Sequence, residues 1–336
     1  READATRPLS LKNSVNKAMC GALAASLHPH LPEAIHGCQR GFVPGRDLVR
    51  NVIDLDTAAR VSSLRADDLR NLARLPPLQC ALAPVLVFLD LVAAFPSLAH
   101  DAIFATMRHL GAPEWVYNAL KCMYTCNMAY ALQEGRSFFI FVISSGVLQG
   151  CPLSSVIFLL AFDPHIRYLI HSLARHDTHA MVRACADDVG CFLSHPKHLA
   201  VVTSCFDNTT ASTGLALGAP KCKIVPCYSR HSKALEFMLR KFLAERVPGA
   251  VRFGIVPTAI YLGIWMGPAA ATEQWRLVLA KFKHRVEQLS HGQGPPFVQL
   301  QLLESRCFTL FSYKAMVSAL PDVKKKERAA IASAMR

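Results

Sequence analysis

The hydrophobic and polar positions of the chain follow two periods, one typical of helices and the other of strands. Apolar residues at helical spacing, in the stripe from Val15 to Leu27, predict an amphipathic helix over residues 13–27. A loop over 37–49 leads into a second helix. The same periodicity predicts helices over 98–110, 113–124, 198–213 and 298–320, and a long apolar helix from Pro152 to about Leu173.

Short apolar or β-branched runs bounded by turn residues predict the strands. One such run, Val85 to Leu89, ends at Asp90. Hairpins are expected over 127–144, 181–193 and 253–267, with a single strand over 223–228. The turn of the second hairpin must contain Asp187 and Asp188. The order of elements fits an antiparallel-rich sheet backed by helices, which is an α+β class.

Composition narrows the class of protein. The chain has 336 residues, of which 52% are hydrophobic and 18% charged, so it can bury a large core in two or three packed subdomains. Its net charge of +13 suits a polyanionic partner, or equally a basic surface kept for solubility. No apolar stretch reaches the ~18 residues of a membrane span, which predicts a soluble protein with no membrane anchor.

The cysteines and the ends of the chain add three expectations. The twelve cysteines show no CxxC spacing or zinc-type set, so most are expected to be small buried residues in a reduced, intracellular protein. The chain opens at Arg1 rather than at methionine, which predicts a fragment of something longer. Basic helices after Thr272 would lie along a nucleic-acid backbone or form solvated faces.

Three short motifs carry candidate chemistry: VFLDLVAAFPSL around Asp90, SGVLQGCPLSS around Gln149, and VRACADDVGC around Asp187 and Asp188. Taken singly, each has a structural reading: a helix cap, a tight turn before a helix, or a solvated hairpin turn. Together they place acids at strand ends, where a divalent cation would relieve the repulsion between neighbouring carboxylates. The set predicts a nucleotidyl-transfer site.

The order and spacing of these motifs resemble the palm of the reverse transcriptases, above all the LINE-like, non-LTR retrotransposon branch. The fingers motifs of that branch resemble RPLSLKNSVNKAMCGALAASL and QRGFVPGRDLVRNV. Its palm motifs resemble, in order, FLDLVAAF, SGVLQGCPLSS, CADD, TGLALGAPKC and YLG. Seven ordered matches make a specific signal, where any one would be weak. Departures are Cys185 for an aromatic residue, Gly218 for Asn and Ser155 for Pro.

The resemblance implies a right-hand polymerase with an antiparallel palm sheet and a helical thumb. Fingers would span 1–80 with 115–150 contributing, the palm 81–268, and the thumb 269–336. The implied function is RNA-directed DNA synthesis on an RNA template from a DNA primer and dNTPs. The family suggests nuclear localisation and further domains of the same polyprotein. A catalytically inactive relic that binds RNA is the alternative, and among polymerases a group II intron or retron enzyme also stays open.

The resemblance also assigns roles to residues. Asp90, Asp187 and Asp188 would form the metal site, with the first two bridging two Mg²⁺ ions, or Mn²⁺ in their place, and the third in support. Lys221 would donate a proton to pyrophosphate. The remaining assignments are Phe95 for excluding a ribose 2′-hydroxyl, Gln149 and Gly150 for the template base and sugar, Arg46 and Arg7 for triphosphate or template, and Tyr261, Leu262 and Gly263 for gripping the primer. For Phe95, Lys221 and the YLG hairpin, the alternatives are a core residue, a surface lysine and a strand with a bulge.

Overall fold

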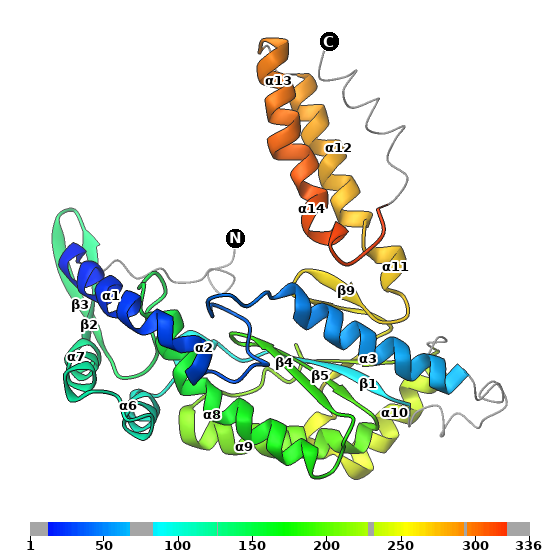
Figure 1. Cartoon of the computed structure of the whole chain (residues 1–336), viewed down its shortest axis with the longest axis horizontal. Coiled ribbons are helices and arrows are strands. Elements are labelled where there is room, and N and C mark those ends of the chain that lie inside the picture. The colour runs from blue at the N-terminus through cyan, green and yellow to red at the C-terminus, as the bar shows by residue number, and fades with distance from the viewer. Residues whose placement is uncertain (1–12, 68–82, 126, 228–231, 292–293, 321–336) are drawn as a thin grey trace.

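The protein, seen in a computed structural model, is described over residues 13–67, 83–125, 127–227, 232–291 and 294–320 (Figure 1). A central five-stranded sheet has the strand order β4-β5-β1-β6-β7. All neighbouring strands pair antiparallel except β6 and β7, which pair parallel. The strands are β4 (Met181–Cys185), β5 (Asp188–Leu193), β1 (Val85–Leu89), β6 (Lys223–Pro226) and β7 (Gly254–Ile255).

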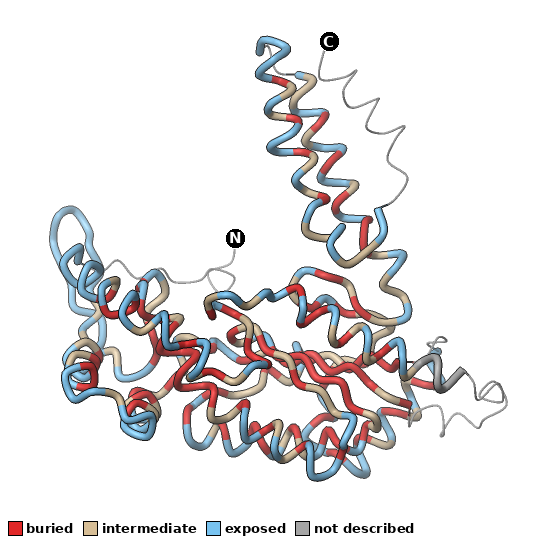
Figure 2. Tube along the Cα trace, viewed as in Figure 1, coloured by how far each residue is buried: buried red, intermediate tan, exposed pale blue. Residues whose placement is uncertain are grey.

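Strands β5, β1 and β6 of this sheet consist mostly of buried residues, which are red in the tube of Figure 2. Val85, Val87 and Leu89 of β1 point into the larger core, while Leu86 and Phe88 point into a second cluster on the other face. Alternate side chains of a strand point to opposite faces, so β1 needs apolar residues at every position. This explains why its sequence reads as an unbroken apolar run.

Helices cover the two faces unequally (Figure 1). The second cluster lies under α3 (Val49–Asp67) and a small separate hairpin of β8 (Ala259–Tyr261) and β9 (Ile264–Met266). The larger core lies under three helices, α8 (Ser154–Ala174), α9 (Leu199–Thr213) and α10 (Lys233–Arg246). Among the described helices, α8 alone has the length and apolar composition of a membrane span, and 61% of that stretch is buried inside the protein.

Beside the sheet lies a helical region that carries an exposed hairpin. The helices of this region are α1 (Ser14–Leu27), a 3₁₀ turn (His28–His30), α2 (Leu31–Ala34), the short α5 (Ala94–Ser97), α6 (His100–His109) and α7 (Glu114–Tyr124). The hairpin of β2 (Asn127–Gln133) and β3 (Arg136–Ile143) leaves most of its side chains exposed, among them Phe138, Phe139 and Phe141. It therefore adds little to the core.

The C-terminal helices form a pair that stands away from the sheet (Figure 1). One member of the pair is α12 (Arg276–Ser290), which follows the short helix α11 (Ala270–Glu273). The other member consists of α13 (Pro296–Leu302), a π-helical turn (Leu303–Phe308) and α14 (Thr309–Ala315). Trp275, Phe282 and Phe311 form a small core of their own between these helices.

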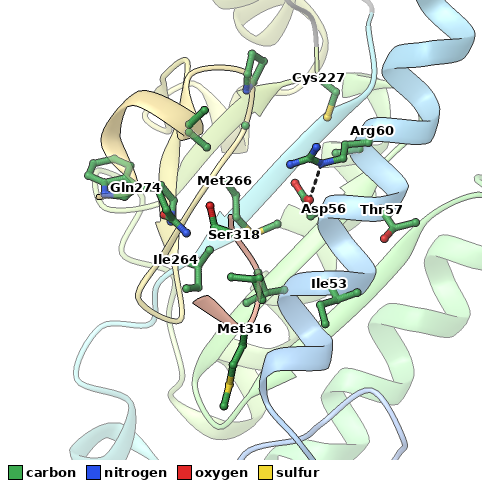
Figure 3. A pocket seen from close by; sticks show the side chains of 18 residues that line it. Ile53, Asp56, Thr57, Arg60, Cys227, Ile264, Met266, Gln274, Met316 and Ser318 are labelled. Atoms are coloured by element: carbon green, nitrogen blue, oxygen red, sulfur yellow. Dashed lines mark hydrogen bonds and ion pairs between the residues drawn. The ribbon is translucent and has the colours of Figure 1, made fainter. Parts of the chain in front are cut away.

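A pocket of about 690 Å³ opens where the base of the helical pair meets α3 and β9 (Figure 3). Ile53, Ile264 and Met316 contribute to its walls, and an ion pair between Arg60 and Asp56 lies at 2.6 Å. Of the predicted site residues that the structure describes, none lines this pocket. The candidate chemistry therefore lies elsewhere.

Most predicted elements are confirmed, and three predictions were wrong. The turn of the hairpin over 181–193 was predicted to contain Asp187 and Asp188, but its residues are Ala186 and Asp187, because Asp188 already pairs with Cys185 in β5. No helix was predicted over 233–246, where α10 forms. The hairpin predicted over 253–267 is divided, because β7 joins β6 in the main sheet and only β8 and β9 form a hairpin. The segment predicted to be a basic helix, with Lys324–Lys326 and Arg328, lies outside the described residues, as does Arg7. The boundaries of the three predicted subdomains stay predictions.

Candidate active site

Three carboxylates meet at one edge of the central sheet. Asp90 follows β1, Asp187 lies in the two-residue turn between β4 and β5, and Asp188 opens β5. The register pairs Leu89 with Val189 across antiparallel strands, so the end of β1 lies beside the start of β5. The strand register thus places the three predicted acids at the same end of neighbouring strands, while their joint role as a metal site stays a prediction. Within the described residues, no group of three or more acid, histidine or cysteine side chains is arranged so that it could hold a metal ion.

These acids nevertheless suit divalent cations chemically. The side chain of Asp90 is 45% exposed, Asp187 is half-buried and Asp188 is exposed, so their oxygens face solvent rather than the core. Carboxylate oxygens are the ligands that Mg²⁺ prefers. Burial, and after it the charges of Asp188 and Asp187, raise the pKa of the Cys185 thiol to about 11. Cys185 therefore stays neutral and adds no further negative charge.

The segment 216–222 packs along the backbone of Asp90. The Gly218 N–H donates to the Asp90 carbonyl at 2.8 Å, and the Asp90 N–H donates to Cys222 Sγ at 3.4 Å. A Cβ at Gly218 would lie 3.3 Å from Asp90 Oδ1, so this segment packs closely against the Asp90 carboxylate. Lys221 Nζ lies 3.9 Å from Asp90 Oδ1 with its side chain 73% exposed. The ammonium group thus lies beside the acids, and its role as proton donor stays a prediction.

Phe95 lies on α5, directly after the motif of Asp90. Its ring stacks on that of Phe158 from α8, with centroids 4.7 Å apart and planes 5° from parallel. The Phe95 carbonyl accepts from the Val147 N–H at 2.8 Å, which ties it to the loop that carries Gln149. The ring is partly buried and packs against the core. The stacking also fixes its orientation, and exclusion of a ribose 2′-hydroxyl by this ring stays a prediction.

Gln149 and Gly150 occupy a turn just before α8. Gly150 has φ of +95°, a conformation that suits a residue without Cβ. The loop that leads to this turn is held in place by a backbone hydrogen bond. Gly146 has φ of +88°, and its N–H donates to the Leu98 carbonyl at 2.7 Å. The loop is therefore held against the Asp90 motif, while contact of Gln149 or Gly150 with a template stays a prediction.

Arg46 is used for structure in this arrangement. Its Nη1 donates to the carbonyls of His36 and Gln39, both at 2.7 Å, and its Nη2 donates to those of Pro32 and Ile35, at 2.7 and 2.8 Å. Desolvation by burial lowers the pKa of this guanidinium. Because these four bonds occupy its terminal nitrogens, the geometry does not support the predicted contact of Arg46 with triphosphate.

The YLG segment divides into a core residue and an outer turn. Tyr261 is only 3% exposed, stacks on Phe88, and donates its hydroxyl to the Arg183 carbonyl at 3.1 Å. Its side chain therefore braces the sheet and cannot reach a primer. Leu262 and Gly263 both have positive φ and form the β8–β9 turn. The Tyr313 hydroxyl of α14 donates to the Leu262 carbonyl at 2.6 Å, which links this turn to the helical pair.

Gln39 is the residue that sequence reasoning missed. It is 1% exposed and bonds through both ends of its amide to Ala186, the residue before Asp187. The motif QRGFVPGRDLVRNV contains it, but no role was predicted for the glutamine. Asn51 is likewise buried and donates to the Ala184 carbonyl at 2.8 Å. The fingers motif thus supports the acid-bearing hairpin.

Residues 1–265 match the family model of the reverse transcriptases (RNA-dependent DNA polymerases). The chain belongs to the reverse transcriptase family. It is 28% identical over 218 residues to the retrovirus-related Pol polyprotein from type-2 retrotransposable element R2DM of Drosophila melanogaster, an alignment that covers 64% of this chain and 19% of that protein. It is 26% identical over 289 residues to the transposon TX1 uncharacterized 149 kDa protein of Xenopus laevis, covering 78% and 20% respectively. The resemblance to the LINE-like branch is confirmed, and the chain spans about a fifth of the length of these relatives.

The fold has a counterpart among solved structures. Apo telomerase from Candida tropicalis superposes with a TM-score of 0.52 at 9% identity, covering 95% of this chain and 54% of that one. At this identity the similarity concerns the fold alone. With the antiparallel sheet backed by helices, it confirms the predicted α+β right-hand polymerase reverse transcriptase fold.

Proposed function

We propose that this chain is the polymerase region of a non-LTR retrotransposon protein and copies an RNA template into DNA from a primer 3′-hydroxyl. The observation that carries the proposal is the convergence of Asp90, Asp187 and Asp188 at one sheet edge, in a chain of the reverse transcriptase family. A net charge of +13 supports binding of a polyanionic template and primer. Nuclear localisation and further domains of the same polyprotein stay predictions from the resemblance.

In the proposed mechanism, Asp90 and Asp187 would hold the divalent ions that reverse transcriptases use, and Asp188 would support them. Bound there, Mg²⁺ or Mn²⁺ would activate the primer hydroxyl and neutralise charge on the leaving pyrophosphate. The exposed ammonium of Lys221, beside Asp90, is placed to give the pyrophosphate a proton. The Phe95 ring, held by Phe158, limits the space below the sugar of an incoming dNTP. Catalysis rests mainly on alignment and charge neutralisation.

The test is primer extension on an RNA template with dNTPs and Mg²⁺, comparing the parent with Asp187→Asn and with Asp101→Asn, an exposed acid on α6. Asp187→Asn should abolish extension while template affinity stays within about threefold of the parent, because phosphate contacts come from Lys and Arg. Asp101→Asn should behave as the parent. An inactive parent that still binds RNA would support the relic instead, and full activity in Asp187→Asn would refute the mechanism.

A further inference from the structure

In the turn that carries Asp187, the preceding residue Ala186 has buried backbone polar groups that require hydrogen-bond partners from outside the strand ladder. Ala186 and Asp187 connect β4 to β5, and the pairing of Cys185 with Asp188 leaves both turn residues outside the strand ladder. Ala186 has φ of +54°, a conformation that costs free energy for any residue with a Cβ. It is only 4% exposed, so water cannot readily satisfy its N–H and C=O. Buried backbone groups require partners.

Gln39 supplies both partners with one side chain. Its Oε1 accepts from the Ala186 N–H at 2.8 Å, and its Nε2 donates to the Ala186 carbonyl at 3.0 Å. The same Oε1 also accepts from the Gly41 N–H at 3.0 Å, which fixes the amide on its own loop. The Ala186 carbonyl belongs to the peptide unit that ends at the Asp187 Cα, and that unit is planar. Holding the carbonyl therefore restricts where the Asp187 carboxylate can point.

The loop of Gln39 packs closely against the Ala186 turn, and further hydrogen bonds and ion pairs hold the two segments together. A Cβ on Gly41 would lie 2.5 Å from the Ala186 nitrogen, so glycine is needed for the loop to approach this closely. The Arg40 N–H donates to the Ala184 carbonyl at 2.9 Å. The Asp54 carboxylate accepts from Arg40 and Arg183, each at 2.7 Å, which joins the two segments through charge. The whole loop is fastened to the hairpin.

We infer that Gln39 is a positioning residue for the polymerase reaction, which clamps the Ala186 turn so that Asp187 is held in the geometry that metal-dependent transfer requires. The inference rests on the proposed function, because it gives Asp187 its role. Because Gln39 is 1% exposed and its amide bonds to backbone groups, we expect it to act through Asp187 and not by contact with substrate. Since errors of about 1 Å in catalytic geometry can cost on the order of 10²-fold in rate, loosening the turn should act on turnover rather than on binding.

The experiment compares Gln39→Met, which keeps the length of the side chain but removes the amide, with Asp177→Ala. Asp177 is a matched control because it is also buried and accepts from backbone N–H groups, those of His179 and Ser194, at the opposite end of the same hairpin. Both variants should lower the melting temperature. Only Gln39→Met should lower kcat, by about tenfold or more, with the KM for dNTP and the template–primer affinity each within about threefold of the parent.

A second variant and a second measurement separate the possible outcomes. Gln39→Glu keeps an oxygen for the Ala186 N–H but sets a second oxygen, in place of the donating nitrogen, against the Ala186 carbonyl, so its kcat should also fall below that of the parent. It also serves if Gln39→Met does not fold. Hydrogen–deuterium exchange of the peptide over residues 184–188 should be about tenfold faster in Gln39→Met than in the parent, as expected when protecting bonds are lost.

A kcat within threefold of the parent in Gln39→Met, or an equal loss of kcat in Asp177→Ala, would overturn the positioning role. If the parent extends no primer, the proposed function fails on its own terms, and the exchange measurement then decides on the clamp. Protection of residues 184–188 in the parent that disappears in Gln39→Met would support it. Equal exchange in the two proteins would overturn it.

Discussion

Replacing Gly146 with Ala should be strongly destabilising, because this residue lies where two motifs of the site press together. Its φ of +88° disfavours a side chain. An added Cβ would also lie 2.5 Å from the Pro96 carbonyl oxygen and 2.7 Å from the Pro96 Cα, both backbone atoms that cannot swing aside. The loop and the Pro96 backbone would have to separate by about 1 Å to restore ordinary contact distances near 3.5 Å.

The expected cost has two parts. The left-handed conformation contributes about 1–2 kcal/mol for a residue with a Cβ. Separation of the segments would break or weaken the bonds from the Gly146 N–H to Leu98 and from the Val147 N–H to Phe95, at 2.7 and 2.8 Å, which are worth about 1 kcal/mol each. The loss in free energy of unfolding should therefore be about 3–4 kcal/mol.

Gly111→Ala provides the matched control. Gly111 has φ of +66°, but nothing lies within 4 Å of its Cβ position, so only the conformational part applies. Urea unfolding followed by circular dichroism should show a loss about 2 kcal/mol larger for Gly146→Ala than for Gly111→Ala. In primer extension, Gly146→Ala should also raise the KM for dNTP, because the same loop carries Gln149 and is bonded through Val147 to Phe95. Equal losses of stability in the two variants would refute the argument from the Pro96 contact.

Three further outcomes are expected. In Phe95→Val, ribonucleotide incorporation should rise about tenfold or more relative to deoxynucleotide incorporation, since the ring that fills the space is lost; an unchanged ratio in folded, active protein would make Phe95 a core residue only. In Tyr313→Phe, loss of the bond to the Leu262 carbonyl should cost about 1 kcal/mol in urea unfolding and shorten the products made per binding event, whereas unchanged product lengths would mean that this link does not support the primer. Desolvation by burial lowers the pKa of four described histidines, His36, His165, His195 and His198. At low pH the unfolded chain then binds more protons than the folded chain. The free energy of unfolding should therefore be highest above the unfolded histidine pKa of 6.5 and should decline as pH falls below it, until the lowered folded pKa values are passed. A melting temperature that stays flat between pH 7 and 5 would contradict this.

Local patterns were sufficient for the acids and insufficient for what surrounds them. Asp90 ends an apolar run and Asp187 lies in a hairpin turn, and both features are visible within ten residues of sequence. The helix α10 was missed although Ser232 caps it and Leu235, Leu239 and Leu243 form its buried stripe. The apolar residues of this helix are not confined to that stripe, because Phe237 is also apolar but is 68% exposed, and this blurs the helical period.

Other features depend on segments that are distant in the sequence. The parallel pairing of β7 with β6 has no local signature, so a strand of two residues was assigned to the wrong hairpin. The role of Arg46 depends on where four carbonyls of the chain come together, and an exposed arginine looks the same in sequence as one with this function. Gln39 stands in a family motif, yet its partner Ala186 is 147 residues away.

That separation has a consequence for the order in which the chain folds. The bond of Gln39 to Ala186 closes a loop of 147 residues, and the bond between Asp90 and Cys222 spans 132. Closing such loops costs entropy before any contact is gained, so structures dominated by them form slowly. On a ribosome, Asp90 and Gln39 would emerge long before the residues that they need. The strand ends that carry Asp90, Asp187 and Asp188 are therefore expected to be among the last parts of the molecule to acquire their native form.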